Sequence, residues 1–512
     1  MKIGFKNFKK FKDFPMIELA PITFLVGANN SGKSSFIKAL TLLFFNLKPL
    51  YKKDYFNDNE EELLENPFKA FSLWIRKISF YQLSMSHLGW GDFETCLNNE
   101  CDTREITFSL QDDRDKYIPE KKEIIFEFSF GATEDEIEND PSLSFSLPVN
   151  SFKTIFKSKG FSIINKYFEG TWHDYIELEN EEVFKCISWL KEFNQKLIEN
   201  KDYQKNRVLD ESLQELIHSN DLTLEDLVKK EDGSSVIIEI TDKNINNSFC
   251  NYYWTETKHV LPIPELYISD VEYIEAHYAH HSQLFSKENK NDYLAQTILE
   301  FYDKITLDDN DADFLWLQKW MRKFEIGSYF KISPQYGGEY FTVEISHTRK
   351  YLKNGKSSFG LLGTGSIHLF TILLRLCLSL YKIKKLTEEG DNGSIIMVII
   401  EEPEINLHPK LQSLLADLFY DVFERSNQRI KIVIETHSEY IIRRSQVIVS
   451  ENVKSKNIRT EEELKQKNPF KVFYFPKDVF PYDMQYRLDG KFRKKFDKGF
   501  FDEASNLAIE LF

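Results

Sequence analysis

Long apolar runs, paired cysteines and a surplus of positive charge are all missing from this sequence of 512 residues. No stretch reaches the roughly 20 uninterrupted apolar residues of a membrane span, and the N-terminus enters a strand-like pattern rather than a signal peptide. We therefore expect a cytoplasmic protein with no membrane partner. The five cysteines are scattered and odd in number, which argues against a disulfide framework, and Cys96 and Cys101 lack a second pair with which to hold zinc.

The formal net charge is -15, from 81 acidic and 66 basic side chains. Such a chain repels a nucleic-acid backbone on average, although a local basic groove could still bind one. The charge thus weakens a DNA-binding function without excluding it. The remaining composition, 42% hydrophobic and 29% charged, is that of a globular protein with core enough for two or three domains.

Residues 27–34 read Gly-Ala-Asn-Asn-Ser-Gly-Lys-Ser, which is the spacing of a phosphate-binding loop. An apolar run at residues 21–26 predicts a buried strand before the loop, and residues 35–43 predict a helix after it. This context suits the motif, because backbone N–H groups and the positive end of a helix dipole together bind phosphate. The alternative is a glycine turn that happens to precede Lys-Ser.

The chemistry fits each position of the loop. Lys33 would reach the β- and γ-phosphates of ATP, and the hydroxyl of Ser34 would ligate Mg²⁺. The loop residues expected to bind the nucleotide are Gly27, Asn29, Asn30, Ser31, Gly32, Lys33, Ser34 and Ser35.

Two carboxylates close a second apolar strand, which is predicted at residues 394–400. A run that is apolar on both faces is typical of the buried centre of a parallel sheet. We expect Glu401 to hold Mg²⁺ through a water molecule and Glu402 to orient the water that attacks the γ-phosphate. Alternation along the strand predicts different roles for the two carboxylates.

A family resemblance follows from two later motifs. Residues 401–409 read Glu-Glu-Pro-Glu-Ile-Asn-Leu-His-Pro, and residues 434–438 read Ile-Glu-Thr-His-Ser. With the phosphate loop, they resemble the ABC-type ATPases of the OLD and RecF/SMC kind. The resemblance implies that His437 is a switch histidine that contacts the γ-phosphate and acts beside Glu402 and Lys33; a histidine that merely caps the next helix is the alternative. Glu401 replaces the more usual aspartate, and a longer carboxylate can still bind Mg²⁺ through water.

Residues 361–366, Leu-Leu-Gly-Thr-Gly-Ser, run into an apolar helix predicted at residues 367–376. In the family, a glycine–serine loop at this place is the signature motif, which contacts the nucleotide held by a partner subunit. The resemblance therefore implies a homodimer or a higher homo-oligomer. The glycine spacing departs from the familiar Leu-Ser-Gly-Gly-Gln form, and a helix-capping turn is the alternative. The implied nucleotide contacts are Gly363, Thr364, Gly365 and Ser366.

The resemblance implies an α/β fold, an ABC-type P-loop ATPase of two lobes with a mixed central sheet and a β-rich plus helical insertion. We expect the insertion at residues 81–270, between cassette parts at residues 1–80 and 271–450, and closing strands and a tail at residues 451–512. Within the insertion, residues 105–110 and 124–130 predict antiparallel strands. Residues 177–230 predict short helices, which are too short for the coiled-coil arms of SMC proteins.

Several smaller assignments stay open. The family's loop that senses Mg²⁺ and the attacking water has two candidates, Gln82 and residues 89–92. His277 and His281 lie one helical turn apart and could bind a metal, with a polar element near the nucleotide or an interface as the alternative. Asn7 resembles the family's asparagine near the nucleoside. The basic run Lys491, Arg493, Lys494 and Lys495 is typical of a solvated hairpin, with a contact patch as the alternative.

The predicted function is that of an ATPase that converts ATP and water to ADP and phosphate and acts as a switch. We find no Toprim or HNH nuclease pattern and expect that the chain is not itself a nuclease. It resembles the stand-alone ATPase subunits of the Septu and PARIS antiphage systems, which implies control of a separately encoded effector, a nuclease or toxin. The alternative is a RecF/SMC-like DNA-binding ATPase of repair or recombination. The long insertion disfavours a third class, the transport ATPases that attach to membrane permeases.

Overall fold

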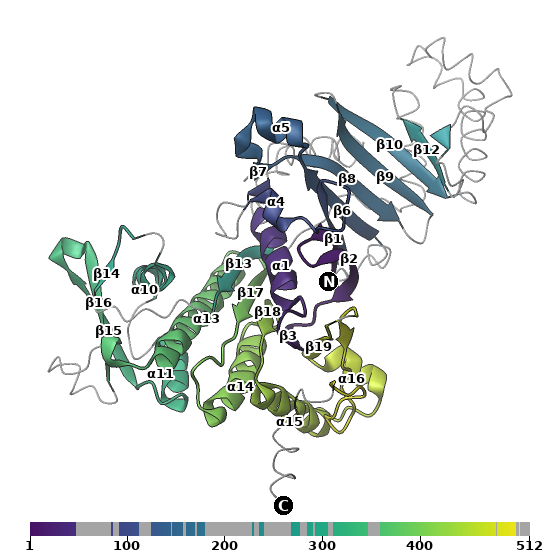
Figure 1. Cartoon of the computed structure of the whole chain (residues 1–512). Coiled ribbons are helices and arrows are strands. Elements are labelled where there is room, and N and C mark those ends of the chain that lie inside the picture. Colours follow the sequence, from purple (N-terminus) through teal and green to yellow (C-terminus); the bar gives the residue numbers. More distant parts are fainter. Residues whose placement is uncertain are drawn as a thin grey trace, which may run out of the picture. The chain divides into compact units, whose positions relative to one another are not determined.

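The computed structural model forms two compact units, one of Met1–Glu18 with Pro49–Leu266 and one of Leu19–Lys48 with Tyr267–Phe512 (Figure 1). The boundaries expected at residues 80, 270 and 450 stay predictions. The residues that the structure describes are 1–47, 83–84, 92–111, 124–144, 146–156, 160–168, 171–179, 228–229, 235–239, 268–276, 284–289, 292–305, 311–346, 359–477, 479–497 and 501.

The first unit is built on a nine-stranded antiparallel sheet, in the order β11-β12-β10-β9-β8-β6-β5-β1-β2. This sheet confirms the β-rich insertion. Its strands are β1 (Lys2–Phe8), β2 (Phe11–Glu18), β5 (Glu105–Gln111), β6 (Ile124–Gly131), β8 (Val149–Phe156), β9 (Phe161–Phe168), β10 (Thr171–Glu179), β11 (Val228–Lys229) and β12 (Ser235–Glu239). The unit also contains β4 (Leu83–Ser84), β7 (Ser146–Leu147), α4 (Phe93–Cys96), α5 (Glu134–Asn139) and the 3₁₀ turn η5 (Pro141–Ser144).

Aromatic side chains on one face of this sheet explain why its first strands pair. Phe5 stacks on Phe14 across β1 and β2 with ring centroids 4.6 Å apart, and Phe108 of β5 approaches Phe5 at 6.5 Å. Cross-strand aromatic pairs of this kind stabilise a sheet. The helices expected over residues 177–230 are wrong at both ends, because residues 177–179 finish β10 and residues 228–229 form β11; residues 180–227 lie outside the described residues.

The second unit contains a six-stranded sheet in the order β13-β17-β18-β3-β19-β20. All its pairs are parallel except β19 with β20, so the expected mixed central sheet is confirmed. The strands are β3 (Ile22–Gly27), β13 (Ile268–Ile274), β17 (Ile395–Glu401), β18 (Ile430–Glu435), β19 (Phe470–Phe475) and β20 (Tyr482–Asp483). A smaller sheet, β14-β16-β15, contains a hairpin of β15 and β16 and is made of β14 (Phe285–Ser286), β15 (Tyr329–Gln335) and β16 (Tyr340–Ser346).

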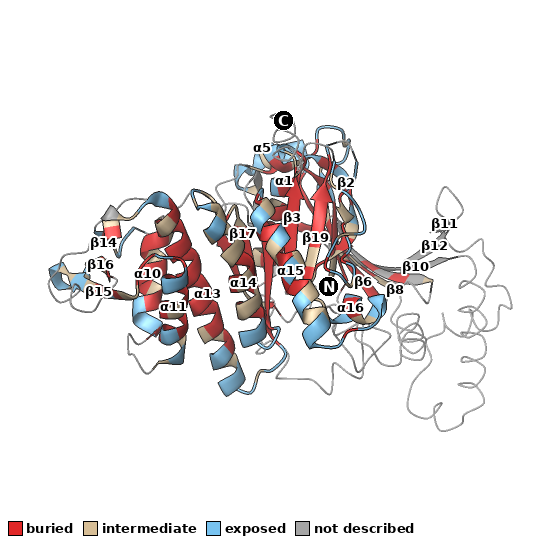
Figure 2. Cartoon of the chain, turned by 90° about the horizontal axis from the view of Figure 1, so that it is seen from below, coloured by how far each residue is buried: buried red, intermediate tan, exposed pale blue. Residues whose placement is uncertain are grey.

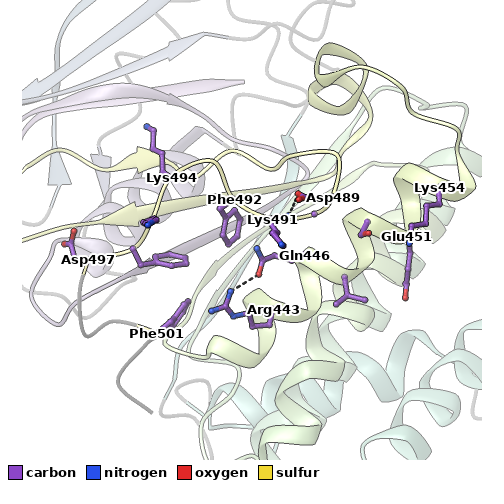
Figure 3. Close-up of a pocket in the computed structure, with 15 residues that line it drawn as sticks. Arg443, Gln446, Glu451, Lys454, Asp489, Lys491, Phe492, Lys494, Asp497 and Phe501 are labelled. Carbon is purple, nitrogen blue, oxygen red and sulfur yellow. Dashed lines mark hydrogen bonds between the residues drawn. The ribbon is translucent and has the colours of Figure 1, made fainter. Parts of the chain in front are cut away.

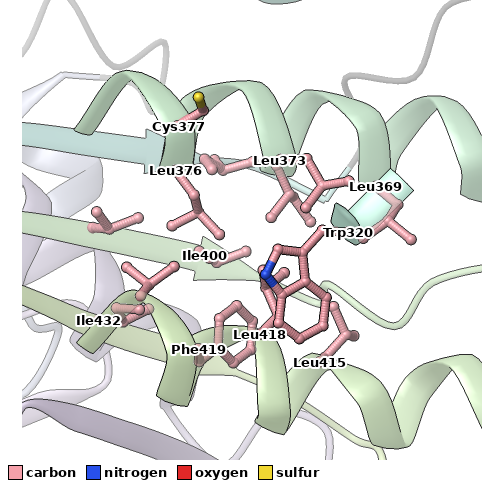
Figure 4. Close-up of a cluster of buried hydrophobic side chains, with 14 of the residues drawn as sticks. Trp320, Leu369, Leu373, Leu376, Cys377, Ile400, Leu415, Leu418, Phe419 and Ile432 are labelled. Atoms are coloured by element: carbon pink, nitrogen blue, oxygen red, sulfur yellow. The ribbon is translucent and has the colours of Figure 1, made fainter. Parts of the chain in front are cut away.

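Helices pack on the central sheet of this unit and bury its strands (Figure 2). The helices of the unit are α1 (Lys33–Leu47), α10 (Tyr293–Lys304), α11 (Ala312–Lys323), α13 (Thr364–Glu388), α14 (Pro409–Arg425), α15 (Glu439–Ser455) and α16 (Glu461–Lys467), with 3₁₀ turns η8 (Tyr336–Gly338) and η9 (Phe359–Leu361). Helices α1, α13 and α14 contact the strands of the sheet, whereas α10 and α11 pack on α13. Figure 4 shows Leu373 and Leu376 of α13 meeting Ile400 of β17 and Phe419 of α14. The continuous apolar run of β17 is therefore explained by burial on both faces.

Helix α13 is the longest in the described part of the chain, and it is a core helix. Within the described residues, only α13 has the length and apolar composition to cross a membrane, and 83% of its apolar window is buried inside the protein. Its neighbour α11 is tied to α14 by polar contacts, because Trp316 and Trp320 both donate hydrogen bonds to Asp421, at 2.5 and 2.9 Å.

Candidate functional site

The loop at residues 27–34 adopts a backbone that demands glycine at two positions. Gly27 ends β3 with a φ of 153°, and Gly32 has a φ of 106°. A Cβ atom at Gly27 would lie 2.2 Å from the carbonyl oxygen of Phe475 in the neighbouring strand β19. The loop therefore passes closely against β19 before α1 begins at Lys33, which is the predicted strand, loop and helix arrangement.

Lys33 is the buried cation of this loop, with 3% of its surface exposed. Its Nζ donates to the carbonyl oxygens of Gly27 and Ala28, at 3.1 and 3.0 Å, and lies 3.8 Å from a carboxylate oxygen of Glu435. Burial lowers the pKa of Lys33, and the negative charges of Glu435 and Glu402 oppose that shift. The ammonium group is thus curled over its own loop, at the place where phosphate oxygens are expected.

Ser34 shares the same carboxylate. Its Oγ donates to Glu435, with both carboxylate oxygens 3.2 Å away, and the residue itself is exposed. Glu435 is the last residue of β18 and only 5% exposed. Burial raises its pKa, while Lys33 and Ser34 stabilise the ionised form. Glu435 is not among the site residues predicted from the sequence; the signal that points to it is a carboxylate that closes the strand leading to His437.

Glu401 and Glu402 follow each other at the end of β17 but point into different surroundings. Burial, and then the nearby charge of Glu435, raise the pKa of Glu401 to about 7, against the opposing effects of the nearby Tyr273 hydroxyl and of the charge on Lys38. Glu402 leaves the strand with a φ of 42°, and its N–H donates to the carbonyl oxygen of Glu435 at 2.9 Å. A left-handed conformation in a residue other than glycine costs roughly 1–3 kcal/mol, and strain of this kind is common at functional sites.

His437 lies at the same edge of the sheet, two residues beyond the end of β18. Its backbone N–H donates to a carboxylate oxygen of Glu404 at 2.6 Å, and Glu404 is buried. Desolvation, and then the positive charge of Lys33, lower the pKa of His437, while Glu402 acts in the opposite direction. The structure thus brings Lys33, Glu402 and His437 into one electrostatic environment. The next helix, α15, is capped by Ser438 rather than by His437, because the Ser438 side chain accepts from the N–H of Ile441.

The proposed signature loop forms the start of α13. Gly363 is the N-cap, Thr364 opens the helix, and both are exposed. Gly365 is buried, and a Cβ atom there would lie 2.5 Å from the carbonyl oxygen of Asn406, in the turn that follows Glu402. Ser366 donates its N–H to the carbonyl oxygen of Gly363 at 2.9 Å. The loop therefore packs on the turn after β17 and presents its first residues to solvent.

Other residues singled out in the sequence have different outcomes. Asn7 holds backbone within the first unit, because its side chain donates to the carbonyl oxygens of Thr103 and Glu105 at 2.6 and 2.8 Å. Gln82, His277, His281 and residues 89–91 lie outside the described residues. Within the described residues no cluster of three or more metal-binding side chains occurs, and none of Cys96, Cys101 and Cys377 forms a disulfide.

The basic run near the C-terminus lines a groove of about 820 Å³ in the second unit (Figure 3). Its walls come from α15, residues 489–492, residues 494–497 and Phe501. Gly490, with a φ of 80°, packs on the carbonyl of Gln446 in α15. The apolar part includes Val447, Phe492 and Phe496. Five cations, Arg443, Lys454, Lys491, Lys494 and Lys495, face three carboxylates, Glu451, Asp489 and Asp497. Arg493 is not in the lining and instead pairs with Glu461 at 3.0 Å.

The residues of the phosphate loop fit ATP and Mg²⁺. The close approach at Gly27 leaves room only for backbone, and the first turn of α1 carries no acidic residue that would repel phosphate. The Ser31 hydroxyl is buried and has no hydrogen-bond partner among the described residues, so it is available to an incoming ligand. Lys33 and Ser34 supply the cation and the hydroxyl oxygen that phosphates and Mg²⁺ require.

The sheet order and the phosphate loop define a P-loop ATPase, and comparison with known proteins agrees. Residues 1–442 match the family model described as "AAA ATPase domain". The chain belongs to this family, whose domains bind ATP, normally with Mg²⁺, and it has the expected α/β P-loop ATPase fold. No curated protein matches the chain.

Two solved structures show a distant likeness. One is the Smc head bound to the C-terminal winged-helix domain of ScpA, with 10% identity and a TM-score of 0.35, covering 94% of this chain and 96% of the other. The second is a Pyrococcus furiosus Smc head with an extended coiled coil bound to the C-terminal domain of ScpA, with 11% identity, a TM-score of 0.27, and coverage of 100% and 98%. TM-scores this low do not bear on the fold or partners of this chain.

Proposed function

We propose that this protein hydrolyses ATP and uses the reaction as a switch. The observation that carries the proposal is the convergence of Lys33, Glu402 and His437 at the end of the central sheet, beside a phosphate loop that fits a nucleotide. These side chains come from three separate elements, and they supply the cation, carboxylate and imidazole that phosphoryl transfer to water uses.

In the proposed reaction, Lys33 leaves the carbonyl oxygens of Gly27 and Ala28 and binds the β- and γ-phosphates. Glu402 accepts a hydrogen bond from the attacking water and orients it toward the γ-phosphate. His437, with its pKa lowered, donates to a γ-phosphate oxygen as a neutral imidazole. Mg²⁺, when bound, would neutralise phosphate charge, with Ser34 as its protein ligand and Glu401 in contact through water.

The exposed start of α13 supports a second part of the proposal, in which ATP joins two copies of the chain. Thr364 and its neighbours lie at a helix N-terminus, which favours the γ-phosphate of a nucleotide held by another subunit. Each active site would then need both chains, so that ATP binding closes a dimer and hydrolysis opens it. Such a switch is suited to holding or releasing a separately encoded effector of an OLD-like antiphage defence system.

The basic groove supports this role by offering a surface for the effector. Its surplus of cations complements an acidic protein segment, and Phe492 and Phe496 offer contact area for apolar side chains. We propose an acidic segment of the effector as the occupant. The double variant Lys491→Glu/Lys494→Glu is expected to lose the co-purifying product of the neighbouring gene while ATP turnover is kept; retention of that product would contradict this placement.

The alternative function is a RecF/SMC-like ATPase that clamps DNA. The cations of the same groove are the observation in its favour. Three carboxylates among the five cations, in a chain of net charge -15, count against a phosphate backbone as the ligand.

The test is to purify the protein with its neighbouring gene products and measure ATP turnover with and without duplex DNA. A stoichiometric protein partner and turnover that DNA leaves unchanged would support the switch. Strong stimulation by DNA with no partner would favour the clamp, and absence of ATP turnover under all these conditions would contradict both.

A further inference from the structure

Two carboxylates close neighbouring strands of the central sheet, and only one of them reaches the phosphate loop. Glu401 and Glu435 are paired in the parallel register of β17 and β18, each as the last residue of its strand. Strand β18 lies between β17 and β3, so Glu435 is one strand nearer to the loop that follows β3. Because neighbouring strands lie about 4.8 Å apart, the difference decides which carboxylate can contact the loop.

The contacts of the two carboxylates agree with the strand order β17-β18-β3. Glu435 lies 3.2 Å from the Ser34 hydroxyl and 3.8 Å from the Lys33 ammonium group. The pKa of Glu401 responds to the charge of Glu435, to Tyr273 of β13 and to the charges of Glu275 and Lys38. Lys38 is one helical turn further along α1 than Ser34, away from the loop.

The hydrogen bond between Ser34 and Glu435 has a defined direction. An ionised carboxylate only accepts, so the single hydroxyl proton of Ser34 points to Glu435. The lone pairs of Ser34 Oγ then face away from Glu435, on the exposed side of the residue. A hydroxyl held in this way is ready to ligate a cation, as side chains that bind metals are in general oriented by a second hydrogen bond.

We propose that Glu435 is the positioning residue of the Mg²⁺ site, acting through Ser34, in addition to Glu401, which the sequence predicts to hold Mg²⁺ through a water molecule. The inference rests on the proposed function, since it needs a nucleotide and a divalent cation at this loop. In this role, the length of the Glu435 side chain and its capacity to accept a hydrogen bond from Ser34 matter more than its negative charge.

Two conservative variants separate these properties. Glu435→Asp keeps the charge but withdraws the oxygens from Ser34 by one methylene, whereas Glu435→Gln keeps the length and one acceptor oxygen but removes the charge. The readout is the affinity for Mn²⁺, as a Mg²⁺ analogue, of protein loaded with a non-hydrolysable ATP analogue, measured from the electron paramagnetic resonance signal of free Mn²⁺. The same substitutions at Glu462, an exposed residue of α16, are the matched control.

A positioning role predicts that Glu435→Asp weakens Mn²⁺ binding by about tenfold or more and Glu435→Gln by about threefold or less, since loss of a supporting hydrogen bond typically costs 10–100-fold in metal affinity. Ser34→Ala should weaken Mn²⁺ binding as well, and adding Glu435→Asp to it should cause little further loss. The inference would be overturned if Glu435→Gln lost more Mn²⁺ affinity than Glu435→Asp. It would also be overturned if the affinity losses of Ser34→Ala and Glu435→Asp multiplied in the double variant.

The proposed function and this inference fail in different ways. If the wild-type protein binds no ATP analogue even with Mg²⁺, the proposed function is contradicted and the inference with it. If the wild-type protein binds analogue and Mn²⁺ but Glu435→Asp keeps full Mn²⁺ affinity, only the inference is overturned.

Discussion

Lys33 shows how one residue can be held ready for a ligand. Its ammonium group is buried, yet it is compensated by two backbone carbonyls and by Glu435, so burial does not leave an unpaired charge. The triphosphate of a nucleotide would bring several charged oxygens to the same place and would compete with these three partners for the ammonium group. We therefore expect that, when a nucleotide binds, the Lys33 ammonium group exchanges the carbonyl oxygens of its own loop for phosphate oxygens.

Substitution of Lys33 by alanine should abolish measurable nucleotide binding, because the loop loses the cation that faces the phosphates. The measurement is a titration with a fluorescent ATP analogue in the presence of Mg²⁺. Lys467→Ala, at an exposed position of α16, is the matched control and should bind as the wild type does. Unchanged affinity in Lys33→Ala would show that the nucleotide does not bind at this loop.

At the scale of elements, the turn after β17 and the start of α13 are packed together so closely that only glycine fits at residue 365. A Cβ atom there would lie 2.5 Å from a backbone oxygen of Asn406, and backbone cannot easily move away. Gly365→Ala should therefore lower the free energy of unfolding by about 1–3 kcal/mol, measured by urea denaturation. It should also displace the turn that carries Glu402.

The control for this prediction is Gly363→Ser, in the same loop. An added Cβ meets nothing within 4 Å there, and serine is a favoured N-cap. The stability of this variant should equal or slightly exceed that of the wild type. If both variants lose the same stability, close packing on Asn406 is not the reason that residue 365 is glycine.

Helices α10 and α13 are joined by partly buried charges, and this ion-pair cluster should make the free energy of unfolding depend on pH. Glu300 lies 2.7 Å from Arg375 and 3.3 Å from Lys382. Burial alone would raise its pKa, but Lys382, then Lys304 and Arg375, hold the pKa of Glu300 at about 2. A lowered carboxylate pKa stabilises the folded state above the ordinary value of 4.5, and that contribution is lost as pH falls from 4.5 toward 2.

Glu300→Gln should therefore reduce the free energy of unfolding at pH 7 by up to about 3 kcal/mol. The deficit should stay constant down to about pH 5 and shrink below it, because the wild-type contribution disappears there. Urea denaturation between pH 7 and pH 3 measures it. Glu388→Gln, which breaks a solvent-exposed pair with Lys385, should cause no measurable change. A deficit independent of pH would mean that Glu300 acts by packing and not by charge.

Strands, helices and loops could be predicted from the sequence where the residues that determine them are neighbours in the chain. The apolar run before Gly27 and the run that ends at Glu401 each mark a buried strand by themselves, and the glycines between a strand and a helix mark the loop. The place of Glu435 could not be predicted, because it depends on β18 lying between β17 and β3, a pairing between segments far apart in the chain. Residues 177–179 were missed for a related reason, since their helical composition gave way to pairing of β10 with β12.

In the whole molecule, the nucleotide site is proposed to depend on assembly of two chains. The phosphate loop, Glu402 and His437 belong to one chain, whereas the exposed start of α13 is proposed to complete the site of another. Hydrolysis and dimerisation should then be coupled, and a variant that binds ATP without hydrolysing it should accumulate as the closed dimer.

The most direct measurement is therefore made on Glu402→Gln with Mg²⁺ and ATP, following phosphate release and the molar mass in solution by light scattering. We expect that this variant binds ATP, turns it over at least about 100-fold more slowly than the wild type, and is trapped as a dimer, because the group that orients the attacking water is lost. Wild-type rates of turnover in Glu402→Gln, or a variant that stays monomeric with ATP bound, would contradict this expectation.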